Sequence, residues 1–184
     1  MSSSRRWLAA RGGIDRTGDA TVLMFHGAGH LTLIRHADTW QAPVTVTDAD
    51  GARDLALAVD PGGPVVIGWT RCQPDCTIFV QRWSPAGFGP ATVVGPNRSP
   101  LPIGLAASGG RALVVWGTDN SLWSRELAGD TWADARRHGE AQSPDRAAIA
   151  FYAGLRDGAI GAASWSFVAG ELEIRTWLAV LSEL

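Results

Sequence analysis

Two cysteines, Cys72 and Cys76, are the residues of this chain best suited to covalent chemistry. They lie in the segment TRCQPDCT, with no other cysteine in the chain and no histidine nearby, whereas a zinc site normally needs four such ligands. The pattern therefore favours a disulfide that restrains the loop between them and would imply an oxidising compartment. Two reduced thiols at the surface are the alternative.

Three histidines, His26, His30 and His36, follow one another closely. Two of them face each other across the turn at residues 27–29, and such a pair could bind zinc or copper. No carboxylate or cysteine completes a ligand set nearby, so we expect surface histidines, with neither a metal nor a cofactor.

Polar and charged residues gather in segments predicted to be loops on one face of the fold. Ligands commonly bind where such loops converge, although surface loops are polar in any case. The candidate contact residues are Asp48, Asp50, Arg53, Asn97, Arg98, Arg137, His138, Glu140, Asp145 and Arg146.

Tryptophan is unusually frequent, with nine residues. Trp69, Trp116 and Trp165 follow similar apolar runs, and we expect them to be buried between neighbouring structural units. Trp40 and Trp132 lie on predicted outer strands and could instead be exposed platforms on which sugar rings stack. Trp83 and Trp123 are further candidates for that role.

The elements that carry these residues repeat along the chain. Residues 111–133 contain three short apolar runs separated by turn-forming residues, and each run is too short for a helix. Trp69 and Trp116 stand 47 positions apart, as do Arg35 and Arg82. The arginine stands at the end of the next run and recurs at Arg125. An aromatic residue follows the next turn, at Trp40, Phe88 and Trp132.

A further apolar run precedes each tryptophan-bearing run, so the unit is four strands in about 47 residues, the size of a β-propeller blade. We therefore predict an all-β propeller domain over residues 1–184, with about four blades at 11–48, 49–97, 98–140 and 141–184. The last repeat lacks an outer strand, and the run Trp7 to Ala10 is surplus. We expect residues 5–10 to complete the last blade and close the ring as a monomer, or else oligomerisation to close it.

The turn Gly129-Asp130-Thr131-Trp132, with Thr39-Trp40 in the first repeat, resembles the end of the Asp-box, S-x-D-x-G-x-T-W. That motif marks the sialidase-like, or BNR, propeller superfamily. Arg125 and Leu127 stand where the motif has serine and aspartate. The chain is also similar to fucose-binding bacterial propeller lectins, whose blades carry tryptophan at repeating positions. Both resemblances imply a glycan ligand.

The resemblance transfers no catalytic residue. A sialidase uses three arginines from different blades, a tyrosine nucleophile with a glutamate partner, and an acidic aspartate. Here Tyr152 is the only tyrosine, and no glutamate pairs with it. Arg53, Arg98 and Arg146 do not align within their repeats. We therefore expect a non-catalytic binding module that recognises a glycan or a protein partner through one loop face. A sialidase-like glycoside hydrolase and a purely structural part of a larger propeller assembly are the alternatives.

Composition excludes further classes of partner. The net charge is −2 and 18% of residues are charged, so no basic nucleic-acid-binding face is expected. No apolar run has the length of a membrane-spanning helix. The beginning of the chain, MSSSRRWLAARGG, lacks the apolar core of a secretory signal, so an extracellular location is expected only if the disulfide forms. All sixteen basic residues are arginine, which we attribute to a GC-rich genome.

Overall fold

The computed structural model describes residues 7–26, 30–46, 49–62, 64–96, 103–118, 121–140, 150–156, 159–168 and 171–180, the last three ranges at the level of the backbone. Regular structure in these ranges consists entirely of β-strands. The prediction of an all-β fold is therefore confirmed. Within the same residues there is no helix long and apolar enough to cross a membrane.

The strands form four sheets that follow one another along the chain. The first contains β1 (Trp7–Ile14), β2 (Ala20–His26), β3 (Leu31–His36) and β4 (Val44–Thr45). The second contains β5 (Ala52–Val59), β6 (Val65–Cys72), β7 (Cys76–Ser84), β8 (Gly87–Phe88) and β9 (Thr92–Pro96). The third contains β10 (Gly104–Ser108), β11 (Arg111–Thr118), β12 (Ser121–Ala128), β13 (Thr131–Trp132) and β14 (Arg136–Glu140), and the fourth β15 (Ala150–Arg156), β16 (Ala159–Val168) and β17 (Glu171–Val180).

Each outer strand is interrupted in the same way. In the second sheet both β8 and β9 pair with β7, and in the third both β13 and β14 pair with β12. At the interruption the backbone N–H of Gly89 donates to Arg82 O, and that of Ala133 donates to Glu126 O, each at 2.9 Å. Gln41 makes the equivalent bond in the first sheet, to the carbonyl of Arg35. These bonds fix the turn before each outer strand.

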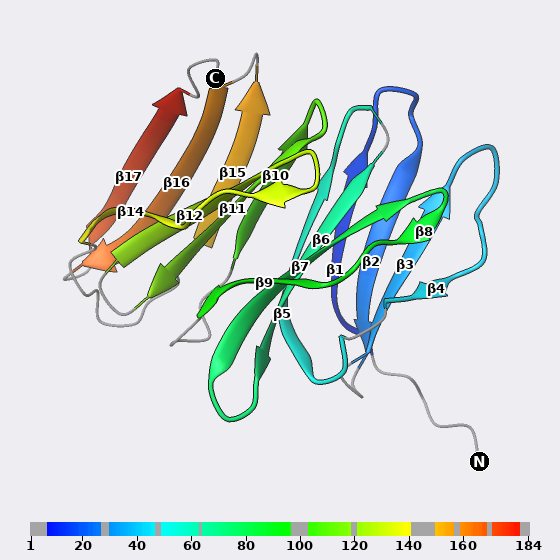
Figure 1. Ribbon diagram of the computed structural model, residues 1–184, viewed down its shortest axis with the longest axis horizontal. Coiled ribbons are helices and arrows are strands. Elements are labelled where there is room, and N and C mark those ends of the chain that lie inside the picture. The colour runs from blue at the N-terminus through cyan, green and yellow to red at the C-terminus, as the bar shows by residue number, and fades with distance from the viewer. Residues whose placement is uncertain are drawn as a thin grey trace.

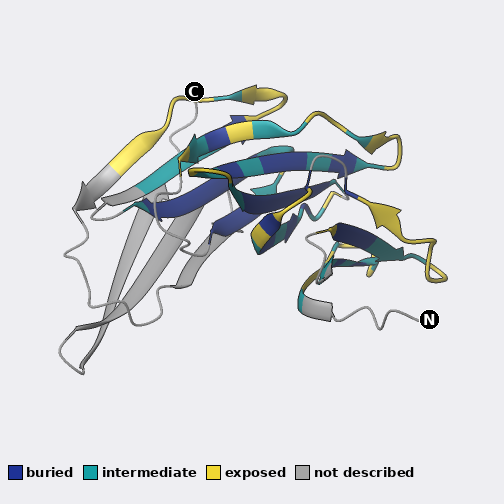
Figure 2. Cartoon of the chain, turned by 90° about the horizontal axis from the view of Figure 1, so that it is seen from below, coloured by how far each residue is buried: buried dark blue, intermediate teal, exposed yellow. Residues whose placement is uncertain are grey.

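The sheets stand side by side in a row, with the first and the fourth at opposite ends (Figure 1). The inner strands β1, β5, β10 and β15 contact one another in that order. Buried side chains gather where the first, second and third sheets pack together (Figure 2), and every residue of β6 from Val65 to Thr70 is buried. Successive side chains of a strand point to opposite faces. Accordingly, Val65, Ile67 and Trp69 pack toward the first sheet, and Val66 packs toward the third.

Side chains also connect neighbouring sheets through hydrogen bonds. Arg82 of β7 reaches the third sheet, where it donates to the carbonyls of Gly110 and Gly129. The carboxylate of Asp60, which is 3% exposed, accepts a 2.7 Å hydrogen bond from the backbone N–H of Gly110. Between the first and second sheets, the Arg35 guanidinium lies 4.8 Å from the ring centroid of Trp83.

The position of the N-terminal strand corrects one prediction. Of the residues 5–10 expected to complete the last blade, those that the structure describes belong to the first sheet, because β1 begins at Trp7 and pairs along β2, from Trp7 opposite His26 to Ile14 opposite Ala20. Asp15 holds the turn between them by accepting hydrogen bonds from the backbone N–H groups of Thr17 and Asp19. A short hairpin loses far less chain entropy than pairing with the distant end of the chain. The inner strand of the first sheet is therefore β1. The row is open in this structure, with the first and fourth sheets at its two ends.

Candidate functional site

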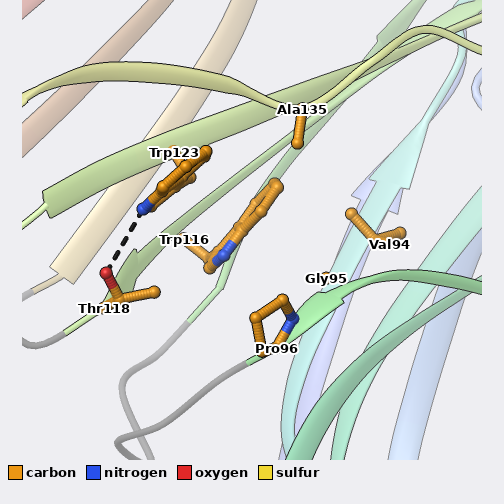
Figure 3. Close-up of a pocket in the computed structure, with 7 residues that line it drawn as sticks. All are labelled: Val94, Gly95, Pro96, Trp116, Thr118, Trp123 and Ala135. Atoms are coloured by element: carbon orange, nitrogen blue, oxygen red, sulfur yellow. Dashed lines mark hydrogen bonds between the residues drawn. The ribbon is translucent and has the colours of Figure 1, made fainter.

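A cleft of about 370 Å³ lies between the outer parts of the second and third sheets. One wall is β9 of the second sheet, and the other is formed by β11, β12 and the segment before β14 (Figure 3). Its lining residues are Val94, Gly95, Pro96, Trp116, Thr118, Trp123 and Ala135. The volume lies within the range of small-molecule sites.

Two tryptophans dominate the cleft. Trp116 of β11 and Trp123 of β12 are directly opposite each other in the strand pair. Their rings stack with centroids 6.4 Å apart and planes 16° from parallel. Trp116 is 1% exposed and belongs to the core between the two sheets, whereas Trp123 is only partly buried. Trp123 therefore presents an aromatic surface that a ligand could reach.

The two indole N–H groups differ in their partners. Nε1 of Trp123 donates to the Thr118 hydroxyl at 3.2 Å (Figure 3). Nε1 of Trp116 is buried and has no hydrogen-bond partner among the described residues. An unsatisfied buried donor costs about 1–3 kcal/mol, and Nε1 of Trp69 is in the same state among the described residues.

Gly95 allows the closest approach of the two walls. A Cβ at this position would lie 2.7 Å from Cζ2 of Trp116, closer than side-chain carbon atoms can pack. Only glycine therefore lets β9 run against the indole ring. Arg137 of β14 lies opposite Trp123 in the β12–β14 pair and so stands on the same face of the third sheet as that tryptophan.

The structure places the predicted loop-face residues in several settings. Asp50 is exposed, and its carboxylate lies 2.8 Å from Nδ1 of His30. Arg53 is exposed on β5. Arg137, His138 and Glu140 belong to strand β14, not to a connecting loop, because this segment pairs with β12 as the second half of the outer strand. Asp48, Asn97, Arg98, Asp145 and Arg146 lie outside the described residues.

The predicted aromatic platforms are not equivalent in their surroundings. Trp40 is 60% exposed, and its ring meets that of His36 edge to face. Trp132 is partly buried against the core between the second and third sheets, beneath the guanidinium of Arg125. Trp69 and Trp116 are 0% and 1% exposed, buried between neighbouring sheets as the sequence predicts. The side chain of Trp165 lies outside the described residues.

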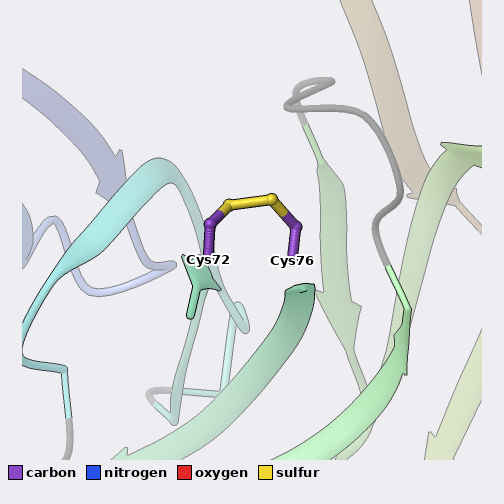
Figure 4. Close-up of a disulfide and its surroundings, with 2 residues drawn as sticks. All are labelled: Cys72 and Cys76. Carbon is purple, nitrogen blue, oxygen red and sulfur yellow. A yellow bond between two sulfur atoms is a disulfide. The ribbon is translucent and has the colours of Figure 1, made fainter. Parts of the chain in front are cut away.

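Cys72 and Cys76 are joined by a disulfide across the three-residue turn between β6 and β7 (Figure 4). The two residues are also opposite each other in that strand pair. Among the described residues, no three histidine, cysteine, aspartate or glutamate side chains come together in a group that could hold a metal ion.

Asp54 is a feature that sequence reasoning missed. It is the extra residue of a bulge in β5, between Arg53 and Leu55, and its φ is 44°. Burial raises the pKa of its carboxyl group, an effect opposed by the charges of Arg53 and Arg11. Its Oδ2 is buried and has no hydrogen-bond partner in the described part of the chain.

The cleft itself was also missed, because Gly95, Pro96 and Thr118 carry no distinctive sequence signal. The sequence feature that could have indicated the cleft is the hairpin of β11 and β12, because it places Trp116 and Trp123 opposite each other across a short turn. An aromatic pair of this kind on a strand pair marks a packed face, but only the neighbouring sheet decides whether part of that face stays open.

Comparisons with known proteins support the fold. No family model and no curated protein matches the chain. Among solved structures, the chain is similar to the Aleuria aurantia lectin, described as a six-bladed β-propeller with a novel fucose recognition mode, with a TM-score of 0.65 and 14% identity. The alignment covers 96% of this chain and 61% of that one.

Two further structures give the same result. AofleA from Arthrobotrys oligospora aligns with a TM-score of 0.56 and 14% identity, over 95% of this chain and 57% of that one. A putative exo-β-1,3-galactanase from Bifidobacterium bifidum aligns with a TM-score of 0.53 and 13% identity, over 97% and 69%. At such identities the likeness shows the fold alone. The chain thus has a β-propeller fold and spans about 61% of the length of the Aleuria lectin.

Proposed function

We propose that this chain is a non-catalytic carbohydrate-binding module that holds a glycan in the cleft between its second and third sheets. Trp123 carries the proposal, because its partly buried ring lines a cleft whose volume suits a small ligand. A sugar ring offers an apolar face that can stack on Trp123 and hydroxyl groups that can bond to Thr118. The fucose recognition described for the Aleuria lectin is consistent with this class of ligand.

The cleft supports binding better than hydrolysis. Glycoside hydrolases usually need two carboxyl groups on either side of the scissile bond. The described residues that line this cleft include no carboxylate. Release of a chromophore from nitrophenyl glycosides by the purified chain would favour the sialidase-like alternative.

Titration with methyl glycosides, beginning with methyl α-L-fucoside and including those of galactose, mannose and glucose, tests the proposal by calorimetry. We expect binding by the wild type and at least a tenfold loss of affinity, equivalent to about 1.4 kcal/mol, in Trp123→Leu and in Thr118→Val. Trp40→Leu is the matched control, because it removes an exposed tryptophan of the first sheet, which contributes no lining residue to the cleft. If Trp40→Leu abolished binding and Trp123→Leu did not, the site would lie elsewhere. If no glycoside bound and the chain formed stable assemblies, the purely structural alternative would be preferred.

We also propose that this open row of sheets associates with a second copy of the chain. Phe88 and Trp132 each pack against the preceding sheet. The equivalent Trp40 belongs to the first sheet, at one end of the row, and it is 60% exposed; Ile14 of the same sheet is 70% exposed. Light scattering should give a mass above the 19.5 kDa of one chain, and Trp40→Asp should lower it. A monomeric wild type would contradict the proposal.

The disulfide supports a further proposal, that the protein works in an oxidising compartment. The intact mass of protein purified from its source, with and without reductant and alkylation, tests this. Two free thiols in that material would contradict it.

A further inference from the structure

One guanidinium joins both walls of the cleft. Arg125 of β12 donates from Nε to Ala133 O at 2.6 Å, within its own sheet. Its Nη1 crosses to the second sheet and lies 3.1 Å from Val93 O and 3.2 Å from Val94 O. Val94 is the first lining residue of the β9 wall, and Ala133 lies two residues before the lining residue Ala135.

The second sheet shows which side chain can make the equivalent bond within a sheet. Gln81 occupies the equivalent place on β7 and donates to Gly89 O at 2.7 Å. Gly89 and Ala133 are equivalent, because each donates its backbone N–H to the residue that follows Gln81 or Arg125. A glutamine is thus sufficient for the bond within the sheet. The extra length and the second nitrogen of the arginine serve the contact between sheets.

We propose that Arg125 is a positioning residue that fixes the separation of the two walls and thereby preorganises the cleft for its ligand. The effect on ligand affinity rests on the proposed glycan site, whereas the effect on the separation of the two walls does not. Hydrogen bonds to a charged donor are stronger than neutral ones, and both cross-sheet acceptors immediately precede Gly95 and Pro96. Loss of these bonds would let β9 move relative to Trp116, and a ligand would then have to order the wall as it binds.

Arg125→Gln is the decisive variant, because it reproduces the residue found at the equivalent position of the second sheet. It should keep the bond to Ala133 O and lose both bonds to β9. We expect affinity for the best-bound methyl glycoside to fall about tenfold. We also expect the Nε1–H of Trp116, followed by NMR hydrogen exchange, to exchange at least about fivefold faster, because the wall over it is no longer held. Arg125→Lys, which keeps the charge and some of the reach, should restore part of both effects.

Arg111→Gln is the matched control. It removes the hydrogen bond from Nε of Arg111 to Glu126 Oε1 in the same sheet, and Glu126 points away from the cleft because it alternates with Arg125 along β12. This control should leave the indole exchange and the affinity unchanged, even if it lowers the melting temperature.

The two readouts separate the inference from the proposed function. Faster indole exchange in Arg125→Gln supports the positioning role, whether or not any glycoside binds the wild type. Absence of glycoside binding by the wild type would then contradict only the proposed function. Unchanged indole exchange in Arg125→Gln, or equal acceleration in Arg111→Gln, would overturn the inference. If Arg125→Gln failed to fold, the same comparison would be made with Arg125→Lys.

Discussion

Replacing Gly95 by alanine tests the closest contact in the cleft. The added Cβ would lie 2.7 Å from Cζ2 and 3.2 Å from Cε2 of Trp116. Carbon atoms normally pack at about 3.5–4.0 Å, so the ring or the strand must move by roughly 1 Å. Trp116 is 1% exposed and stacked on Trp123, so its ring has little room to yield.

Overpacking of this kind costs about 1–3 kcal/mol of folding free energy. In a chain of 184 residues, that corresponds to a fall of roughly 2–12 °C in the melting temperature. Urea and thermal unfolding followed by tryptophan fluorescence would measure both quantities. The displaced ring should also weaken glycoside binding in the cleft.

Gly89→Ala is the matched control for this prediction. A Cβ on Gly89 would meet only the Arg82 carbonyl oxygen, at an ordinary 3.8 Å. We expect it to change stability by less than about 0.5 kcal/mol. If Gly95→Ala were as stable as Gly89→Ala, then the Trp116 ring would not lie against β9, and the cleft would not have the described shape.

Three further predictions address other parts of the structure. Trp116→Ala should destabilise the fold by about 3–5 kcal/mol in urea unfolding; a loss under about 1 kcal/mol would place this ring at the surface. The Thr17 hydroxyl, 2.6 Å from Asp15, holds the pKa of that carboxyl below its usual value. The resulting stabilisation is present above the pKa that Asp15 has in the unfolded chain, and it is lost as the pH falls through the pKa of the folded protein. Thr17→Val should therefore lose less stability on acidification than the wild type, measured by urea unfolding at several pH values. Reduction of the Cys72–Cys76 bond should lower the free energy of unfolding by about 2 kcal/mol, because the loop that it closes is short. Urea unfolding measures this change, and the intact mass checks the redox state.

The sequence by itself determined the strands and their hairpins. Short apolar runs separated by turn residues are local signals, and a hairpin forms between neighbours in the chain. The turn between β6 and β7 and the aromatic residues Phe88 and Trp132 are found where their spacing predicts them. The burial of Trp69 and Trp116 followed from the size of the side chain and the apolar run that precedes each.

The tertiary structure alone decided which face of a sheet each side chain occupies. Arg82 and Arg125 both close a third strand, yet Arg82 reaches the following sheet and Arg125 the preceding one. Arg82 is opposite Val66, three residues before Trp69, whereas Arg125 is opposite Val114, two residues before Trp116. Side chains alternate with a period of two, so this difference of one residue reverses the face. The cleft depends on the same choice, because its walls come from two sheets whose contact is not encoded in either strand alone.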